Sequence, residues 1–221
     1  MNVAANIVES EAAQVAAPVP FVGLRRGYYG AIAVDAPMRF KSYAPAELQP
    51  WNRRRDNARH YRTMSWDDLM ALPVSELANP KGCHLFIWSS GPFLPWTLRL
   101  IEAWGFKYST RAFTWAKARP SWDGVSPLDP DKDFPSITGH TVRHQTELVL
   151  LARRGNCRRK AKNVDELIIA PRREHSRKPD EFYRRVETYC DGPYVDLFAR
   201  ERRPGWDPWG DEVGRFNGDG S

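Results

Sequence analysis

The sequence predicts an α/β protein in which helices flank a mostly parallel sheet. Short apolar runs with the composition of buried strands alternate along the chain with stretches whose apolar residues recur at helical spacing. Glycines and prolines separate the two kinds of segment. This alternation is typical of strands joined by right-handed helical crossovers, which place successive strands parallel in one sheet.

The first predicted strand covers residues 28–34, an apolar run that ends at Asp35-Ala36-Pro37. Pro37 has no backbone N–H and therefore cannot extend a ladder of hydrogen bonds. A carboxylate at the carboxyl end of a buried strand stands where open α/β sheets bind their ligands. A solvated turn at Asp35 is an equally consistent interpretation of this stretch taken alone.

The next segments predict two helices around a second strand. Ser65 predicts the hydroxyl-capped start of a helix, which Pro73 divides into two short pieces. The apolar run 83–88 predicts a buried strand. Residues 94–104 carry apolar side chains at helical spacing and are followed by Gly105, a residue typical of helix C-termini.

Further strands are predicted around a long loop. Residues 111–117, 146–151 and 167–170 have strand composition. The segment 118–143 is rich in proline and acidic residues and shows no period, and a loop of this length in a compact domain is usually functional. Residues 153–162 are interpreted as a basic turn.

The C-terminal part predicts a helix, a strand and two turns. Pro179, interpreted as a first helical residue with acidic residues behind it, predicts a helix start. Residues 194–199 have strand composition, and 204–206 and 208–210 are interpreted as turns with aromatic anchors. We expect a mobile N-terminal tail over 1–20, one domain over 21–213 and a C-terminal tail over 214–221.

The charge balance favours an anionic partner. The 221 residues include 33 Lys and Arg against 27 Asp and Glu, which gives a net charge of +6. The pI is about 9.3. Such a balance favours polyanions, nucleic acid first among them, although a merely soluble basic surface has the same charge.

Several classes of protein are disfavoured. The three cysteines form no Cys-x-x-Cys pair and the five histidines form no ligand cluster, so we expect no metal and no disulfide scaffold. Nucleophile-elbow and phosphate-loop motifs are absent. No apolar run approaches the roughly 18 residues of a membrane span and no signal-peptide pattern opens the chain, so we expect a cytoplasmic protein that does not enter a membrane.

Three motifs in a fixed order carry the functional signal. Asp35-Ala36-Pro37-Met38 ends the first strand, the helix start 174–181 follows much later, and the strand 194–200 comes directly after that helix. In this order they resemble amino-group methyltransferases of the permuted kind, most closely the bacterial and phage branch of the MT-A70 family of adenine N6-methyltransferases. Further matching stretches are 60–64, 100–106, 115–117, 169–173 and 204–210.

The resemblance implies a Rossmann-like S-adenosylmethionine-dependent methyltransferase fold with permuted motif order, and it gives the motif around Asp35 a catalytic role. The exocyclic amine of adenine is a poor nucleophile because its lone pair is delocalised into the ring. Hydrogen-bond acceptors at that amine position it and counter the delocalisation. The resemblance makes Asp35 the carboxylate acceptor and the backbone carbonyl of Ala36 or Pro37 the second acceptor. Met38 would cover the unstacked base.

The resemblance also implies contacts for cofactor and substrate. The residues expected to bind S-adenosylmethionine are Lys117, His175, Lys178, Pro179, Phe198, Arg200, Asp211 and Glu212. The residues expected to face nucleic acid are Arg39, Phe40, Lys41, Tyr43, His140 and Arg143, for which a solvated loop is the competing interpretation. The loop 118–143 is expected to serve as the active-site and substrate loop.

Three positions depart from the family pattern. Ala36 replaces the usual first proline, Met38 replaces the usual aromatic residue, and Asp211 stands where relatives carry an asparagine. A methionine can cover a base, but the stacking of a base on an aromatic ring is worth about 1–3 kcal/mol.

The resemblance therefore implies transfer of a methyl group to the N6 amine of adenine in nucleic acid, with DNA favoured over RNA. The alternatives are a catalytically impaired homologue that binds nucleic acid or serves as a partner subunit, an N4-cytosine enzyme, and a basic α/β protein unrelated to methylation. A homodimer and a pair with a second methyltransferase-like subunit are the assemblies left open.

Overall fold

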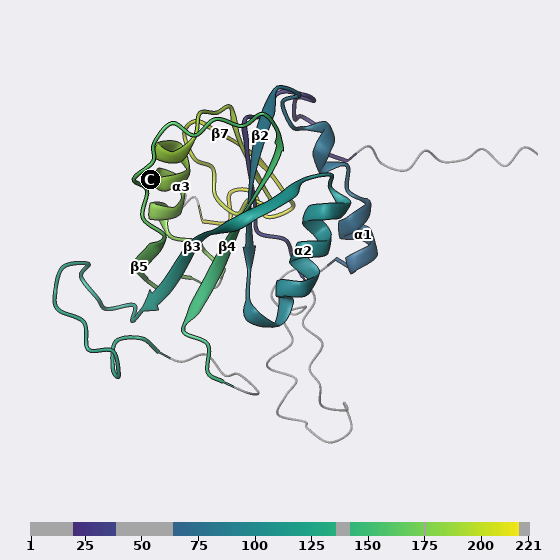
Figure 1. Cartoon of the computed structure of the whole chain (residues 1–221). Coiled ribbons are helices and arrows are strands. Elements are labelled where there is room, and N and C mark those ends of the chain that lie inside the picture. Colours follow the sequence, from purple (N-terminus) through teal and green to yellow (C-terminus); the bar gives the residue numbers. More distant parts are fainter. Residues whose placement is uncertain (1–19, 39–63, 136–141, 175, 217–221) are drawn as a thin grey trace, which may run out of the picture.

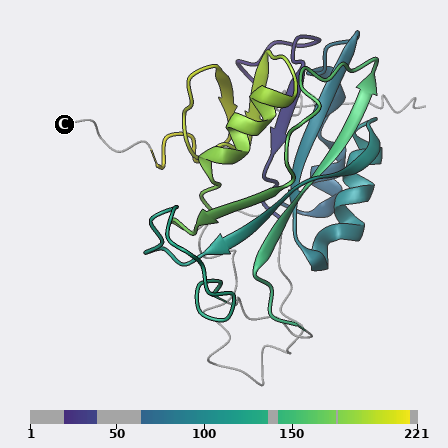
Figure 2. The ribbon, with the colours of Figure 1, turned by 60° about the vertical axis from the view of Figure 1, so that its left-hand side comes forward.

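A computed structural model describes residues 20–38, 64–135, 142–174 and 176–216 (Figure 1). Within them, seven strands form one sheet in the order β5-β3-β4-β2-β1-β6-β7. Helices α1 and α2 cover one face of this sheet and α3 covers the other (Figures 1 and 2). The arrangement confirms the predicted α/β class.

The elements have the following bounds. The strands are β1 (Ala31–Val34), β2 (Gly82–Ser89), β3 (Lys107–Ala118), β4 (Thr146–Gly155), β5 (Leu167–Pro171), β6 (Tyr194–Leu197) and β7 (Trp206–Trp209). The helices are α1 (Trp66–Ala71), α2 (Leu94–Ala103) and α3 (Asp180–Tyr189), with short 3-10 turns η3 (Val74–Glu76) and η4 (Gly91–Phe93).

The direction of β4 decides which residues meet at the edge of the sheet where the parallel strands end. β1 pairs parallel with β2 and β6, β3 with β5, and β6 with β7. β4 runs antiparallel to both of its neighbours, β2 and β3. The first residues of β4 therefore lie at the edge where the other six strands end.

Apolar side chains hold the layers together. Seven of the eight residues of β2 are buried, as expected for a central strand that is covered on both faces. Leu100 and Ile101 of α2 pack into the core on one face of the sheet, and Phe182 and Val186 of α3 pack into the core on the other. The spacing of these pairs gives each helix one buried stripe.

The structure contains the predicted helix start at Ser65 and the predicted break at Pro73, but the third helix begins one residue later than predicted. The hydroxyl oxygen of Ser65 accepts a hydrogen bond from the backbone N–H of Asp68 at 3.1 Å, which caps α1 as predicted. Pro73 separates α1 from η3. Pro179, however, precedes the helix as its N-cap residue with an extended backbone, and α3 begins at Asp180.

Several predicted strands have different bounds. β1 begins at Ala31 because the backbone N–H groups of Tyr28 and Tyr29 donate to the carbonyl of Leu77 instead of entering the ladder. β3 extends back to Lys107 because it pairs with β4 there, and β4 extends to Gly155 because its last residues pair with the start of β2.

The interpretation of 204–206 and 208–210 as turns was wrong for Trp206–Trp209, which form the edge strand β7, whereas residues 204–205 do form a turn. The residues of β7 pair with β6 on one side only, and an edge position tolerates Pro208 because the missing N–H leaves no neighbour unpaired.

The long loop is partly described. Residues 119–135 run between β3 and β4 without regular structure, and Arg119 pairs with Asp133 at 2.7 Å. The boundary predicted at 213 stays a prediction, and Phe216 beyond it lines the pocket described below. Across the described ranges, no helix is long and apolar enough to cross a membrane. The cytoplasmic location stays a prediction.

Candidate active site

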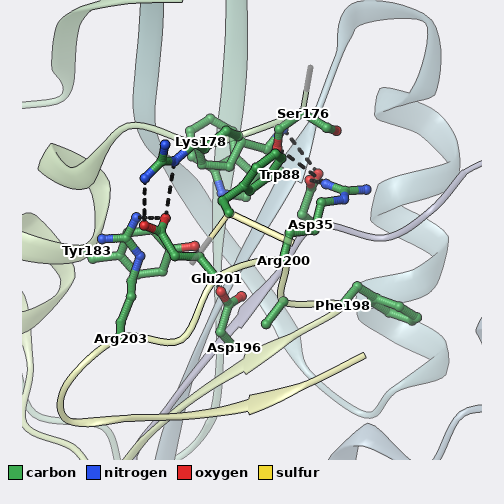
Figure 3. A pocket seen from close by; sticks show the side chains of 13 residues that line it. Asp35, Trp88, Ser176, Lys178, Tyr183, Asp196, Phe198, Arg200, Glu201 and Arg203 are labelled. Atoms are coloured by element: carbon green, nitrogen blue, oxygen red, sulfur yellow. Dashed lines mark hydrogen bonds and ion pairs between the residues drawn. The ribbon is translucent and has the colours of Figure 1, made fainter. Parts of the chain in front are cut away.

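Segments that are distant in the sequence meet at the edge where the parallel strands end (Figure 3). Asp35 directly follows β1, Arg200 lies shortly after β6, and Lys178 comes just before α3. Their side chains enclose a small pocket whose cavity volume is about 20 Å³. The residues that line it are Asp35, Trp88, Ser176, Arg177, Lys178, Tyr183, Asp196, Phe198, Ala199, Arg200, Glu201, Arg203 and Phe216.

Asp35 is held by two cations. Its Oδ1 lies 3.1 Å from the Nζ of Lys178, and its Oδ2 lies 2.7 Å from Nη1 of Arg200. The Nε of Arg200 lies 2.8 Å from Oε2 of Glu212, a residue of the turn after β7. The carboxylate of Asp35 is 19% exposed, so it faces the pocket with both oxygens already paired.

Glu147 extends this chain of ion pairs. Its Oε2 lies 2.8 Å from the Nζ of Lys178, and its Oε1 lies 2.5 Å from the Nζ of Lys117. Glu147 reaches these lysines because β4 runs antiparallel and begins at this edge. Alternating charges thus connect the end of β3 with the end of β1, so that no buried charge in this row lacks an opposite neighbour.

Burial and ion pairing compete in setting the pKa values of this row. Burial by itself raises the pKa of Glu147, but the ammonium groups of Lys178 and Lys117 outweigh it and lower the pKa to about 2. Burial likewise opposes the charged form of Lys178, yet the carboxylates of Asp35 and Glu147 raise its pKa. For Lys117, burial outweighs its single carboxylate partner and the pKa is lowered.

Two residues in left-handed backbone conformations shape the pocket. Ser176 has φ 70° and Phe198 has φ 62°, values that are uncommon for residues with a side chain. The carbonyl of Ser176 accepts a hydrogen bond from Arg200 at 3.3 Å. A Cβ on Gly210 would lie 2.9 Å from the Cα of Phe198, so the turn after β7 needs glycine to approach this strand end.

A second carboxylate lies deeper, on β6 itself. Asp196 is 7% exposed, and its Oδ2 accepts a hydrogen bond from the hydroxyl of Tyr183 at 2.8 Å. Burial raises the pKa of Asp196 to about 7, although the bond from Tyr183 opposes this shift. The pocket therefore holds one carboxyl group that changes its charge near neutral pH.

Arginines form the remaining wall. Arg203 lies 2.6 Å from Glu201 and 2.6 Å from Asp180, and its guanidinium stacks over the ring of Tyr183 at 4.0 Å. The Nε of Arg203 is buried and donates to no acceptor among the described residues. Arg177 pairs with Glu201 at 2.7 Å. A buried donor without an acceptor beside a pocket is a suitable contact for a polar ligand.

The structure brings together most of the residues predicted to bind the cofactor. Lys178, Phe198 and Arg200 line the pocket with Asp35. Lys117 and Glu212 join it through their ion pairs. Pro179 is buried as the N-cap residue of α3, and Asp211 is exposed in the turn after β7. The roles of these residues stay predictions.

The rest of the predicted catalytic motif is buried and does not line the pocket. Ala36 and Met38 are 6% and 7% exposed, and both belong to the core cluster under α1 and α2. The carbonyl of Ala36 accepts the N–H of Met38 at 2.8 Å, and that of Pro37 accepts the N–H of Met64 at 3.0 Å. Met38 is not among the residues that line the pocket.

Most of the residues expected to face nucleic acid fall outside the described part of the chain. Arg143 is described and exposed, in the segment that leads into β4. The predicted residues outside the described ranges are Arg39, Phe40, Lys41, Tyr43 and His140, together with the predicted cofactor residue His175.

Sequence reasoning missed Glu147 and Asp196, together with the aromatic residues Trp88 and Tyr183 around them. The Nζ of Lys178 lies 4.8 Å from the ring of Trp88. A carboxylate inside the apolar run of β6 was the only available signal for Asp196. Glu147 gave none, because its position follows from the direction of β4.

A mostly parallel sheet with a charged pocket at the carboxyl ends of its central strands defines a Rossmann-like protein, a class that binds ligands at this edge. Comparison with known proteins gives the family. The MT-A70 family model matches residues 35–212, and the chain belongs to this methyltransferase family.

Curated relatives agree with this assignment. The chain is 31% identical over 156 residues to Type II methyltransferase M.MunI of Mycoplasma sp, covering 69% of this chain and 60% of the relative. It is 27% identical over 193 residues to human N(6)-adenine-specific methyltransferase METTL4, covering 76% of this chain and 36% of the relative. It is 26% identical over 165 residues to N(6)-adenosine-methyltransferase non-catalytic subunit METTL14 of Xenopus tropicalis, covering 72% of this chain and 36% of the relative. The chain thus spans between about a third and three fifths of the length of these relatives.

Proposed function

We propose that this protein is an S-adenosylmethionine-dependent methyltransferase that acts on the N6 amine of adenine in nucleic acid, with DNA favoured over RNA. The observation that carries the proposal is the convergence of Asp35, Lys178 and Arg200 on one pocket at the end of β1 and β6. Membership of the MT-A70 family and the likeness to named adenine methyltransferases support it.

The chemistry of the pocket suits S-adenosylmethionine, which carries a carboxylate, an ammonium group, a sulfonium and ribose hydroxyls. Lys178 supplies a cation for the carboxylate, and Asp35 and Asp196 supply negative charge for the cationic groups. Glu212 is an acceptor for ribose hydroxyls. The unpaired Nε of Arg203 offers a further donor within the described residues. These residues fit the cofactor.

The present geometry holds these side chains against one another. A cavity volume of about 20 Å³ admits about one water molecule. The ion pairs of Asp35 with Lys178 and Arg200 must therefore separate before a larger ligand enters. The charges of a zwitterionic, cationic ligand replace the partners that each side chain gives up, which offsets the cost of breaking buried pairs.

S-adenosylmethionine supplies an electrophilic methyl group when it is bound. Asp35 accepts a hydrogen bond from the amine of adenine and stabilises the positive charge that develops on nitrogen as the new N–C bond forms and the sulfonium S–C bond breaks. The amine then releases one proton to solvent. The carbonyls of Ala36 and Pro37 each accept one backbone N–H and keep a second lone pair, so either is able to accept from the same amine. Catalysis then consists of positioning and electrostatics, without a covalent intermediate.

The test is mass spectrometry of nucleosides from the DNA and RNA of cells that express the wild type, Asp35→Asn or the surface control Arg99→Gln. We expect N6-methyladenine from the wild type and the control, and at least a roughly 100-fold loss in Asp35→Asn, because the neutral amide no longer stabilises the developing charge. Methylated adenine in RNA alone would reverse the preference for DNA. N4-methylcytosine as the product would show that the enzyme acts on the amine of cytosine instead of adenine. The proposal would be rejected if a wild type that binds S-adenosylmethionine produced no methylated nucleoside.

A catalytically impaired homologue is the second candidate. The burial of Met38 and the replacement of the usual first proline by Ala36 favour it, as does the likeness to a subunit named non-catalytic. Such a chain would act as a nucleic-acid-binding or partner subunit, or in a homodimer. Calorimetry discriminates: tight binding of S-adenosylmethionine supports the first candidate. No cofactor binding beside salt-dependent nucleic-acid binding supports the second.

A further inference from the structure

A dense run of positive charge begins in the last residues of β4 and continues beyond the end of that strand. We define the basic turn as residues 153–162, which contain six Lys or Arg residues and no acidic residue. All six are exposed. These six residues are Arg153, Arg154, Arg158, Arg159, Lys160 and Lys162. None of the six lines the candidate active site at Asp35.

The basic turn lies at the opposite end of the sheet from the candidate active site. β4 begins next to the pocket, where Glu147 pairs with Lys178, and runs antiparallel to the rest of the sheet. Arg154 lies seven residues further along the same strand. At about 3.4 Å per residue the two positions are about 24 Å apart. Figures 1 and 2 show the segment between β4 and β5 at the end away from residues 119–135.

The basic turn is anchored at both of its ends. The N–H of Asn156 donates to the carbonyl of Lys81 at 2.9 Å, and the N–H of Lys160 donates to the carbonyl of Tyr189 at 2.7 Å. Gly155 has φ 72°, and a Cβ there would lie 3.0 Å from the Lys81 carbonyl oxygen, so glycine permits this close approach. The residues between these anchors are therefore presented in a fixed arrangement, which lowers the entropy cost of binding.

The charge of the basic turn is largely unneutralised. Among the described residues the ion pair of Lys160 with Asp191, at 3.5 Å, is the one that involves the turn, and Asp191 is 82% exposed. Arg154 donates to the carbonyl of Gly105 at 3.1 Å, a contact that leaves its charge in place. Burial and the charge of Arg153 lower the pKa of His84, which pairs with Arg153 across β2 and β4, to about 4, so this histidine carries no charge at neutral pH.

We propose that the basic turn binds the phosphate backbone of the substrate nucleic acid, at a second contact outside the catalytic pocket. The turn contains no aromatic side chain on which a base would stack, and all of its exposed charged groups are arginines and lysines, which contact phosphates. The contact is therefore independent of sequence. A duplex that lies along the strands reaches from the pocket to the turn with about seven base pairs, since each pair rises about 3.4 Å. This inference rests on the proposed function for its substrate class.

The test compares two double variants that remove the same charge. Arg158→Gln/Arg159→Gln changes the basic turn, whereas Arg99→Gln/Arg184→Gln changes two exposed arginines on α2 and α3. Binding is measured with an adenine-free G·C duplex of about 20 base pairs while the salt concentration is raised from about 50 to about 200 mM.

Each lost phosphate contact reduces the magnitude of the log–log salt slope by about 0.9. We therefore expect the slope of the turn variant to fall by about two and that of the control to stay unchanged. Equal responses of the two variants, or a wild type that does not bind the duplex, would overturn the proposal. Because the duplex contains no adenine, this result does not depend on methyl transfer.

Methylation kinetics give an independent readout. On an adenine-containing duplex of about 20 base pairs, the turn variant raises KM and leaves kcat unchanged, because the lost contact serves binding alone. On a duplex too short to reach the turn, fewer than about seven base pairs, the variant and the wild type have equal KM. A lower kcat on both substrates would contradict a role limited to phosphate binding.

Discussion

The ammonium of Lys178 lies 3.1 Å from a carboxylate oxygen of Asp35, which joins the start of helix α3 to the end of strand β1. The same ammonium lies 2.8 Å from Glu147. Lys178 therefore cannot move toward a ligand without affecting both acids. The charge of each residue in the row Asp35, Lys178, Glu147 and Lys117 therefore influences the others.

Glu147→Gln tests that row. The substitution leaves the buried ammonium of Lys117 without an opposite charge, so we expect the free energy of unfolding at pH 7 to fall by about 3–5 kcal/mol in urea denaturation. Glu166→Gln is the matched control: its partner Arg111 is 48% exposed and the expected change is below about 1 kcal/mol. Equal losses in the two variants would show that the row contributes no more than a surface pair.

The stabilisation by Glu147 depends on pH. Its pKa in the folded protein is about 2, below its ordinary value of 4.5. A group with a depressed folded pKa contributes stability above its unfolded pKa and loses it as the pH falls through the folded value. We expect the difference in unfolding free energy between wild type and Glu147→Gln to narrow between pH 4.5 and pH 2. If the difference in unfolding free energy stays constant over this pH range, Glu147 does not have a lowered pKa in the folded protein.

Asp196→Asn has the opposite pH dependence. Burial raises the pKa of Asp196 from 3.8 to about 7, so the folded protein binds a proton that the unfolded chain releases. Stability therefore falls as the pH rises from 3.8 to about 7, by at most about 4 kcal/mol. The neutral amide removes this dependence, so the stability of Asp196→Asn relative to wild type should increase across the interval.

Tyr183→Phe serves as the control for that experiment. The hydroxyl of Tyr183 donates to Asp196 and opposes the rise of its pKa. Its removal should raise the pKa of Asp196 further and preserve the fall of stability with pH. Thermal unfolding at several pH values measures both variants, and parallel profiles of Asp196→Asn and wild type would contradict the prediction.

Met38→Trp tests whether the usual aromatic residue of the family fits here. Met38 is 7% exposed and packs within the core, so a larger ring overfills the site. We expect a loss of about 1–3 kcal/mol in the free energy of unfolding and no gain in methyl transfer. A variant with unchanged Tm and higher kcat would show instead that the side chain at this position turns into the pocket.

The sequence by itself determined the α/β class and the placement of Asp35, Lys178 and Arg200 at the ends of secondary-structure elements. Such features depend on neighbours along the chain: apolar period, a proline that ends a strand, and a helix start. The resemblance of the ordered motifs pointed to the family that the comparison then gave.

Only the tertiary structure decided the rest. The antiparallel direction of β4 brings Glu147 to the pocket and carries Arg154 to the opposite end of the sheet. Pairing with β6 turns 206–209 into a strand, and packing under α1 and α2 buries Met38. Each of these outcomes depends on hydrogen-bond partners, packing neighbours and opposite charges that come from remote parts of the chain, and local sequence patterns do not encode such pairings.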